Sequence, residues 1–184
     1  MTSRLRRIAA PAVAVITAAL LAAGCAGQPG AAAVVDGEPI TESDLTDAST
    51  TLAPFLQEGV APAALLAAMI QAPVLMDIAA ERGIAISADQ AQQQLAANAE
   101  AGGIEVPEEY SPETMELARY LFLVNMVNQS PDAQAINEEF AAELAELDVE
   151  VSPRYGTWNP DLSQGSTIQA TAPEWIAPVA PEQA

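Results

Sequence analysis

Carboxylates are the most abundant side chains in this chain that could do chemistry. Its 184 residues include 25 Asp and Glu but only six arginines, and they include neither histidine nor lysine. This composition excludes Ser-His-Asp triads, Cys-His dyads, Schiff-base and P-loop lysines, and zinc sites that contain histidine. Paired carboxylates, as in glycoside hydrolases, remain an alternative, but the acids are so widespread that no pair stands out. We therefore expect no catalysis, no metal and no cofactor.

The single cysteine, Cys25, ends a segment that resembles a secretion signal. Three arginines lie within the first seven residues, an apolar stretch of residues 8–23 follows, and small residues precede Cys25. A basic start, an apolar run too short to span a membrane comfortably, and small residues before a cysteine are typical of a bacterial lipoprotein signal. We predict a signal peptide over residues 1–24 and lipidation of Cys25. An uncleaved anchor and an ordinary secretory signal are the alternatives.

Lipidation would place the protein on the extracytoplasmic face of the cell membrane. No second cysteine exists to form a disulfide with Cys25. Two acyl chains would anchor it stably, since each buried methylene group contributes about 0.8 kcal/mol. The small residues of segment 25–32 predict a flexible tether to the membrane.

Charge in the remaining chain is strongly negative. After Cys25, only Arg82, Arg119 and Arg154 accompany the 25 acids. Such a domain repels phosphate backbones and anionic lipid head groups, which excludes nucleic acid as a partner and holds the domain away from the lipid surface.

The first folded segment predicts a short hairpin and a capped helix. Residues 33–35 favour a strand, Asp36-Gly37 is a turn signal, and Pro39 is compatible only with an edge strand. Thr41 can cap the next helix, and the acid three residues later completes a capping box. Pro54 predicts the end of this helix.

A second helix over residues 62–82 is apolar on most of its circumference, which predicts a central helix kinked at Pro73. A third helix begins at the cap Ser87 and ends near Gly102-Gly103. It contains Leu95 among many alanines and glutamines, and it is the least hydrophobic of the helices.

Two further helices and a strand complete the predicted fold. Ser111-Pro112 starts a helix to about residue 128, and Ser130-Pro131 starts another to about residue 147. Residues 149–151 alternate as a strand, which we expect to pair with residues 34–35. The predicted class is therefore mainly all-α, with about five helices and two short strands near the termini. The domain spans residues 33–160, and the Pro- and Ala-rich segment 161–184 predicts a largely disordered tail.

Three segments resemble the SurA and PrsA type of extracytoplasmic folding factors. Residues 34–45 resemble the opening V-N-G-x-x-I-T-x-x-D-L of that family. Residues 75–90 are similar to its A-x-x-x-G-I-x-V-S-x-x-E-V pattern. Residues 149–158 resemble the V-x-V-N-P-R-Y-G-x-W that closes the SurA-like domain in envelope lipoproteins of high-GC bacteria. Together they cover most of residues 33–160.

This resemblance implies a peptide-binding helical domain, shared in outline with trigger factor, that holds unfolded or exported polypeptides. Many relatives insert a parvulin prolyl isomerase domain, but here only about eight residues, 104–111, separate neighbouring helices. The chain also lacks the histidines of that domain, so we expect no isomerase activity. The expected function is a membrane-anchored holdase chaperone. The alternative is a noncatalytic accessory lipoprotein that binds one envelope partner or a small ligand.

Two groups of residues are candidates for function. Methionine side chains adapt to varied partners, so four methionines and one phenylalanine on the helical faces are candidates for a client-binding surface: Met69, Met76, Met115, Phe122 and Met126. Core packing is the more common role of such residues. The cluster Arg154, Tyr155 and Trp158 could form a stacking platform for a ligand. A structural motif, in which the aromatics cover the end of the bundle and Arg154 pairs with an acid, is the favoured interpretation.

Overall fold

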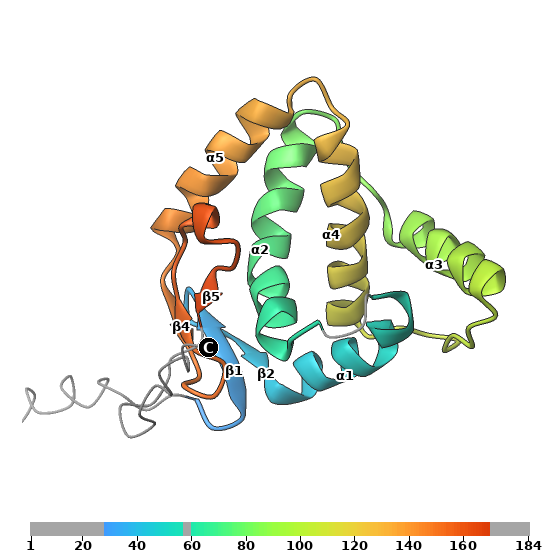
Figure 1. Ribbon diagram of the computed structural model, residues 1–184, viewed down its shortest axis with the longest axis horizontal. Coiled ribbons are helices and arrows are strands. Elements are labelled where there is room, and N and C mark those ends of the chain that lie inside the picture. Colours follow the sequence, from blue (N-terminus) through green and yellow to red (C-terminus); the bar gives the residue numbers. More distant parts are fainter. Residues whose placement is uncertain (1–27, 57–59, 170–184) are drawn as a thin grey trace, which may run out of the picture.

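A computed structural model describes residues 28–56 and 60–169 (Figure 1). The predicted signal peptide, Cys25 and the tail from residue 170 lie outside these residues. The fold is mainly helical, as predicted, and its five α-helices are α1 (Glu42–Leu52), α2 (Pro62–Glu81), α3 (Ala88–Gly102), α4 (Pro112–Asn128) and α5 (Ala133–Glu146). Its short strands are β1 (Ala31–Val35), β2 (Glu38–Thr41), β3 (Val149–Val151), β4 (Thr157–Trp158) and β5 (Ile168–Gln169).

The first sheet joins the two ends of the helical domain. Its strand order is β2-β1-β3, with both pairs antiparallel. Val34 lies opposite Glu150 and Val35 opposite Val149, which confirms the predicted pairing. Asp36 and Gly37 both have positive φ, 50° and 88°, as in the hairpin turns that Asp-Gly favours. Pro39 lies in the edge strand β2, where its missing N–H breaks no ladder.

Local capping sets the starts of three helices. The Thr41 side chain accepts from the backbone N–H of Asp44, and Asp44 accepts in return from that of Thr41. Ser87 and Gln90 form the same reciprocal pair before α3. Ser111 accepts from the backbone N–H of Thr114. All three predicted caps are confirmed.

The predicted start of α5 at Ser130-Pro131 is wrong by two residues. The Ser130 hydroxyl accepts from the backbone N–H of Asp132, and its carbonyl accepts from the N–H of Ala133. These bonds close a turn before the helix, so α5 begins at Ala133 without a side-chain cap.

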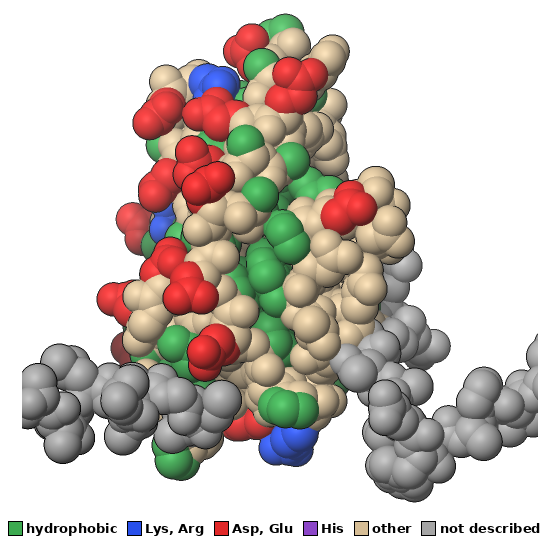
Figure 2. Space-filling view, turned by 90° about the vertical axis from the view of Figure 1, so that its left-hand side faces the viewer, with side chains coloured by type: hydrophobic (Ala, Val, Ile, Leu, Met, Phe, Trp, Pro, Cys, Tyr) green, Lys and Arg blue, Asp and Glu red, His purple; other side chains and the backbone are tan. Residues whose placement is uncertain are grey.

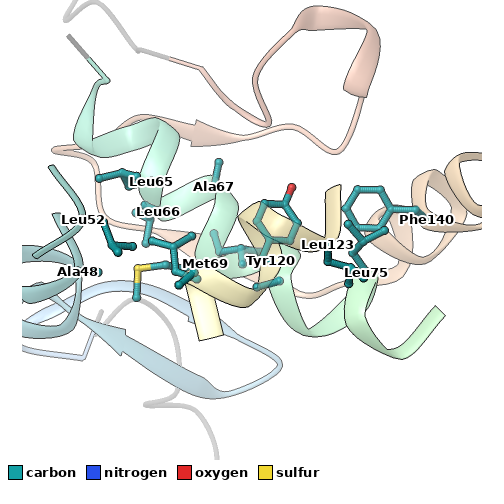
Figure 3. Close-up of a cluster of buried hydrophobic side chains, with 14 of the residues drawn as sticks. Ala48, Leu52, Leu65, Leu66, Ala67, Met69, Leu75, Tyr120, Leu123 and Phe140 are labelled. Carbon is teal, nitrogen blue, oxygen red and sulfur yellow. The ribbon is translucent and has the colours of Figure 1, made fainter. Parts of the chain in front are cut away.

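The core is centred on α2, which packs against α4 and α5 (Figures 1 and 3). Leu66, Ile70, Leu117 and Leu123 are at most 1 % exposed, and buried alanines such as Ala72 let the helices approach closely. Among the described residues, α2 is the one helix long and apolar enough to cross a membrane. Half of that stretch is buried within the domain, as expected for a central helix.

The folded region is wider than predicted at both ends. Ala31 and Ala32, assigned to the tether, belong to β1, and Ala32 is fully buried. Beyond residue 160, a 3-10 turn over Leu162–Gln164 leads into β5, which pairs with β4 in a second sheet. The two predicted strands correspond to β1 and β3. Strands β4 and β5 were not predicted, because a strand of two residues has too short a pattern to detect.

Candidate functional site

A hollow of about 370 Å³ with a mostly apolar lining opens between α1, α3 and α4. We call it the apolar pocket. Among the described residues, its lining contains no charged side chain and consists of apolar side chains and two asparagines: Leu52, Phe55, Leu56, Val60, Leu95, Ala118, Leu121, Phe122, Asn98 and Asn125. A volume of this size, with a mostly apolar wall and few polar groups, is typical of a binding site.

The apolar pocket has a buried floor and a partly open mouth. Leu52, Leu95 and Ala118 are at most 3 % exposed and belong to the core. Leu121 and Phe122 are half-buried, and Val60 at the mouth is 38 % exposed. The pocket therefore offers apolar area that a ligand can bury, which is the main source of favourable binding free energy.

The narrow docking of α3 creates this pocket. Only Ala91, Leu95 and Ala99 of α3 are buried, one per turn along a single face. This seam packs on α4, whereas α3 stands apart from α2 and α5 (Figure 1). Because two of its three buried side chains are alanines, α3 leaves the neighbouring apolar residues of α4 incompletely covered.

A second hollow, of about 750 Å³, lies where the β1–β2 hairpin meets α2 and α5. We call it the acidic groove. Its floor is apolar and includes Ile40, Ile70, Val74 and Ile78. Its described lining includes seven acids and no arginine: Asp36, Glu38, Asp77, Glu81, Glu116, Glu139 and Glu143. A hollow of about 150 Å³ adjoins it, shares Glu116 and Met69, and adds Asp44 and Glu113.

Few cations offset this negative charge. In the described part of the chain, Arg82 forms an ion pair with Glu139. Burial raises the pKa of Glu116, Arg119 lowers it, and the charges of Glu113 and Asp77 raise it further. Figure 2 shows acidic side chains concentrated along one flank of the face that carries α5, beside a central band of apolar side chains.

The structure separates the five predicted client-binding residues. Met69 is 7 % exposed in the core, where it also reaches both acidic hollows, and Met76 and Met115 are half-buried against the core. Phe122 lines the apolar pocket. Met126 is 39 % exposed and lines a different hollow beside α3. The five residues therefore do not line one common hollow, and their part in client binding stays a prediction.

Arg154 and Tyr155 both contact Glu42, the first residue of α1. Arg154 Nη1 donates to Glu42 Oε1 at 3.0 Å, and the Tyr155 hydroxyl donates to Glu42 Oε2. Trp158 lies in β4 opposite Ile168 and packs half-buried against the core. These contacts favour the structural interpretation of the cluster, because its members join the C-terminal segment to α1 and to β5.

A buried polar relay was not predicted from the sequence. The Tyr120 hydroxyl donates to Gln71 Oε1 at 2.6 Å, and Gln71 Nε2 donates to Thr167 Oγ1 at 2.8 Å. Burial raises the pKa of Tyr120 to about 12, so its hydroxyl remains a donor at neutral pH. The available signal was Gln71 itself, a polar residue in the middle of an otherwise apolar helix.

The two hollows were also missed as sites, because their lining comes from elements far apart in the sequence. The acids of the groove do not converge in the way that a metal ion requires: residues 28–56 and 60–169 contain no group of three or more His, Cys, Asp or Glu side chains that could hold a metal ion.

No family model matches the chain, no curated protein matches it significantly, and neither does any solved structure.

Proposed function

We propose that this protein is a membrane-anchored extracytoplasmic holdase, which binds unfolded or exported polypeptides without a chemical step. The observation that carries this proposal is the apolar pocket, which is open at Val60 and has no charged side chain among the described residues that line it. A holdase needs such apolar area, because binding the unfolded state removes it from aggregation by mass action.

The resemblance to SurA and PrsA supports the same proposal, and so does the role of its motifs in the fold. The opening motif includes the Asp36-Gly37 turn and the Thr41 cap, and the closing motif includes Tyr155, which contacts the start of α1. We propose that the helical domain is of the SurA type and that lipidated Cys25 tethers it to the membrane.

The weak docking of α3 adds to this proposal. A helix held by one leucine and two alanines can shift at low cost, so the pocket can adapt to side chains of different sizes. A chaperone with many clients requires such adaptability.

The test uses two valines with matched exposure. Val60 is 38 % exposed at the mouth of the apolar pocket, and Val106 is 37 % exposed outside it. The full chain is reconstituted in phosphatidylcholine nanodiscs, and light scattering follows the aggregation of reduced insulin and of heat-unfolded citrate synthase. We expect suppression of both. Val60→Asp should weaken it roughly tenfold, because a charge at the mouth must lose water when a client binds.

Val106→Asp is the control, since it changes the charge by the same amount and should leave suppression unchanged. Equal effects of the two substitutions would remove the apolar pocket from the proposal. Failure of the unchanged protein to suppress either aggregation would refute the holdase. In that case, retention of one envelope protein on the immobilised chain would favour the accessory lipoprotein.

A further inference from the structure

The acidic groove differs from the apolar pocket in the chemistry that it can recognise. Its floor is apolar, with Ile40, Val74 and Ile78, and its described lining includes seven acids but no cation. The described lining of the apolar pocket contains no charged side chain. A ligand that fits the groove must therefore bury apolar groups and carry positive charge next to them.

The acids of the groove are available to such a ligand. Asp77, Glu81 and Glu143 are exposed, and the structure gives them no ion pair among the described residues. They come from two elements, α2 and α5, and face one hollow. Close like charges repel one another, so a cation placed between them gains more than it would beside one isolated acid.

Charge also excludes two other occupants. A second copy of this chain carries a formal net charge of −19, so it would meet the groove with like charge. The chain's own segment 170–184 contains Glu174 and Glu182 and no arginine. The second copy is therefore repelled as a whole, and segment 170–184 has no cation to offer the groove.

We propose that the acidic groove binds cationic amphipathic segments of polypeptides, in which lysines or arginines alternate with apolar residues. The inference rests on the proposed function in taking a polypeptide as the ligand, and it adds a client class. The apolar side chains contact the floor, and the cations lie against Asp77, Glu81 and Glu143. Half-buried Glu116 extends the negative charge into the adjoining hollow.

The test measures the fluorescence anisotropy of labelled decapeptides with the full chain in phosphatidylcholine nanodiscs, with empty nanodiscs measured in parallel. The probes alternate valine with lysine, with glutamine or with glutamate. We expect the lysine peptide to bind at least tenfold more tightly than the glutamine peptide and the glutamate peptide not to bind. Added salt should weaken the binding of the lysine peptide selectively, because salt screens the attraction between its lysines and the acids of the groove.

Two triple variants distinguish binding in the acidic groove from general attraction of the peptide to an acidic protein. The groove variant is Asp77→Asn with Glu81→Gln and Glu143→Gln. The control is Glu100→Gln with Glu105→Gln and Glu108→Gln, which removes three exposed acids that line neither hollow. We expect the groove variant to lose about tenfold in affinity for the lysine peptide and the control less than twofold. Equal losses would overturn the proposal in favour of general attraction to an acidic protein.

A second measurement keeps the test decisive if the groove variant does not fold. The lysine peptide is titrated into the unchanged protein, and amide NMR shifts are followed. Shifts in residues 69–81 and 139–147 support the groove, whereas shifts confined to α3 and α1, or dimerisation without peptide binding, overturn it.

The outcomes also distinguish this inference from the holdase. If insulin aggregation is suppressed but the lysine and glutamine peptides bind equally, the groove proposal fails and the holdase stands. If the lysine peptide binds as expected but no client aggregation is suppressed, the holdase fails and the groove remains a peptide site.

Discussion

Glu42 binds two side chains of the C-terminal segment through one carboxylate. Its side chain is 27 % exposed, whereas its ion-pair partner Arg154 is 75 % exposed. Water screens such an exposed pair, which limits its contribution to stability. The Tyr155 hydroxyl also donates to this carboxylate. Burial raises the pKa of Tyr155, the hydrogen bond and charge of Glu42 raise it further, and Arg154 lowers it. The tyrosine therefore stays protonated at neutral pH and remains a donor.

We predict that Tyr155→Phe destabilises the protein more than Arg154→Ala. Loss of a hydrogen bond to a half-buried carboxylate should lower the free energy of unfolding by about 1–2 kcal/mol. Loss of the exposed ion pair should lower it by less than about 1 kcal/mol. Urea unfolding of both variants measures the difference. A larger loss for Arg154→Ala would mean that the ion pair, and not the tyrosine, holds this end of the domain.

At the scale of elements, α3 is the helix with the least tertiary support. It buries Ala91, Leu95 and Ala99, whereas α2 buries nine residues. Its own signals are strong, with a capping box at Ser87 and a left-handed Gly103 at its C-cap. Local bonds therefore determine that α3 is a helix, but only a thin seam determines where it lies.

We expect amide hydrogen exchange to show that α3 has less tertiary support than α2. Amides of α3 should exchange faster than those of α2, because α3 can detach without disrupting the core. Leu95→Ala removes the largest side chain of the seam and should lower the local opening free energy of α3 by about 2–3 kcal/mol. Protection in α2 should change little. If α2 and α3 lose protection together, the two helices unfold as one cooperative unit.

At the scale of the whole molecule, the C-terminal segment closes the fold onto the central helix. Thr167 is 1 % exposed and Ile168 is 4 % exposed. Gln71 connects Thr167 on one side with Tyr120 of α4 on the other. One amide side chain therefore links three segments that lie far apart in the sequence by hydrogen bonds.

We predict that Gln71→Ala lowers the free energy of unfolding by about 1–3 kcal/mol, since it leaves two buried hydroxyls without their partner. Gln94→Ala, at an exposed position of α3, is the matched control and should change it by less than about 0.5 kcal/mol. Urea unfolding measures both variants. A loss for Gln71→Ala no larger than the control would mean that other groups satisfy Tyr120 and Thr167.

Much of the secondary structure could be predicted because its causes are local. The caps at Thr41, Ser87 and Ser111 join groups three residues apart. The Asp36-Gly37 turn is likewise set by neighbouring residues. The missed start of α5 shows the limit of this reasoning, since the Ser130 hydroxyl bonded two residues ahead and closed a turn instead of a cap.

The sequence by itself determined the helical class, the central position of α2, the β1–β3 pairing and the acidic character of the domain. These follow from hydrophobicity, short-range hydrogen bonds and charge, which need no knowledge of distant contacts. Only the tertiary structure decided which apolar side chains remain open. Met69 and Phe122 both lie on apolar helical faces, but packing leaves the first only 7 % exposed beside the acidic hollows and the second half-buried in the wall of the apolar pocket. Burial depends on what a neighbouring helix covers, and that coverage is a property of the assembled fold.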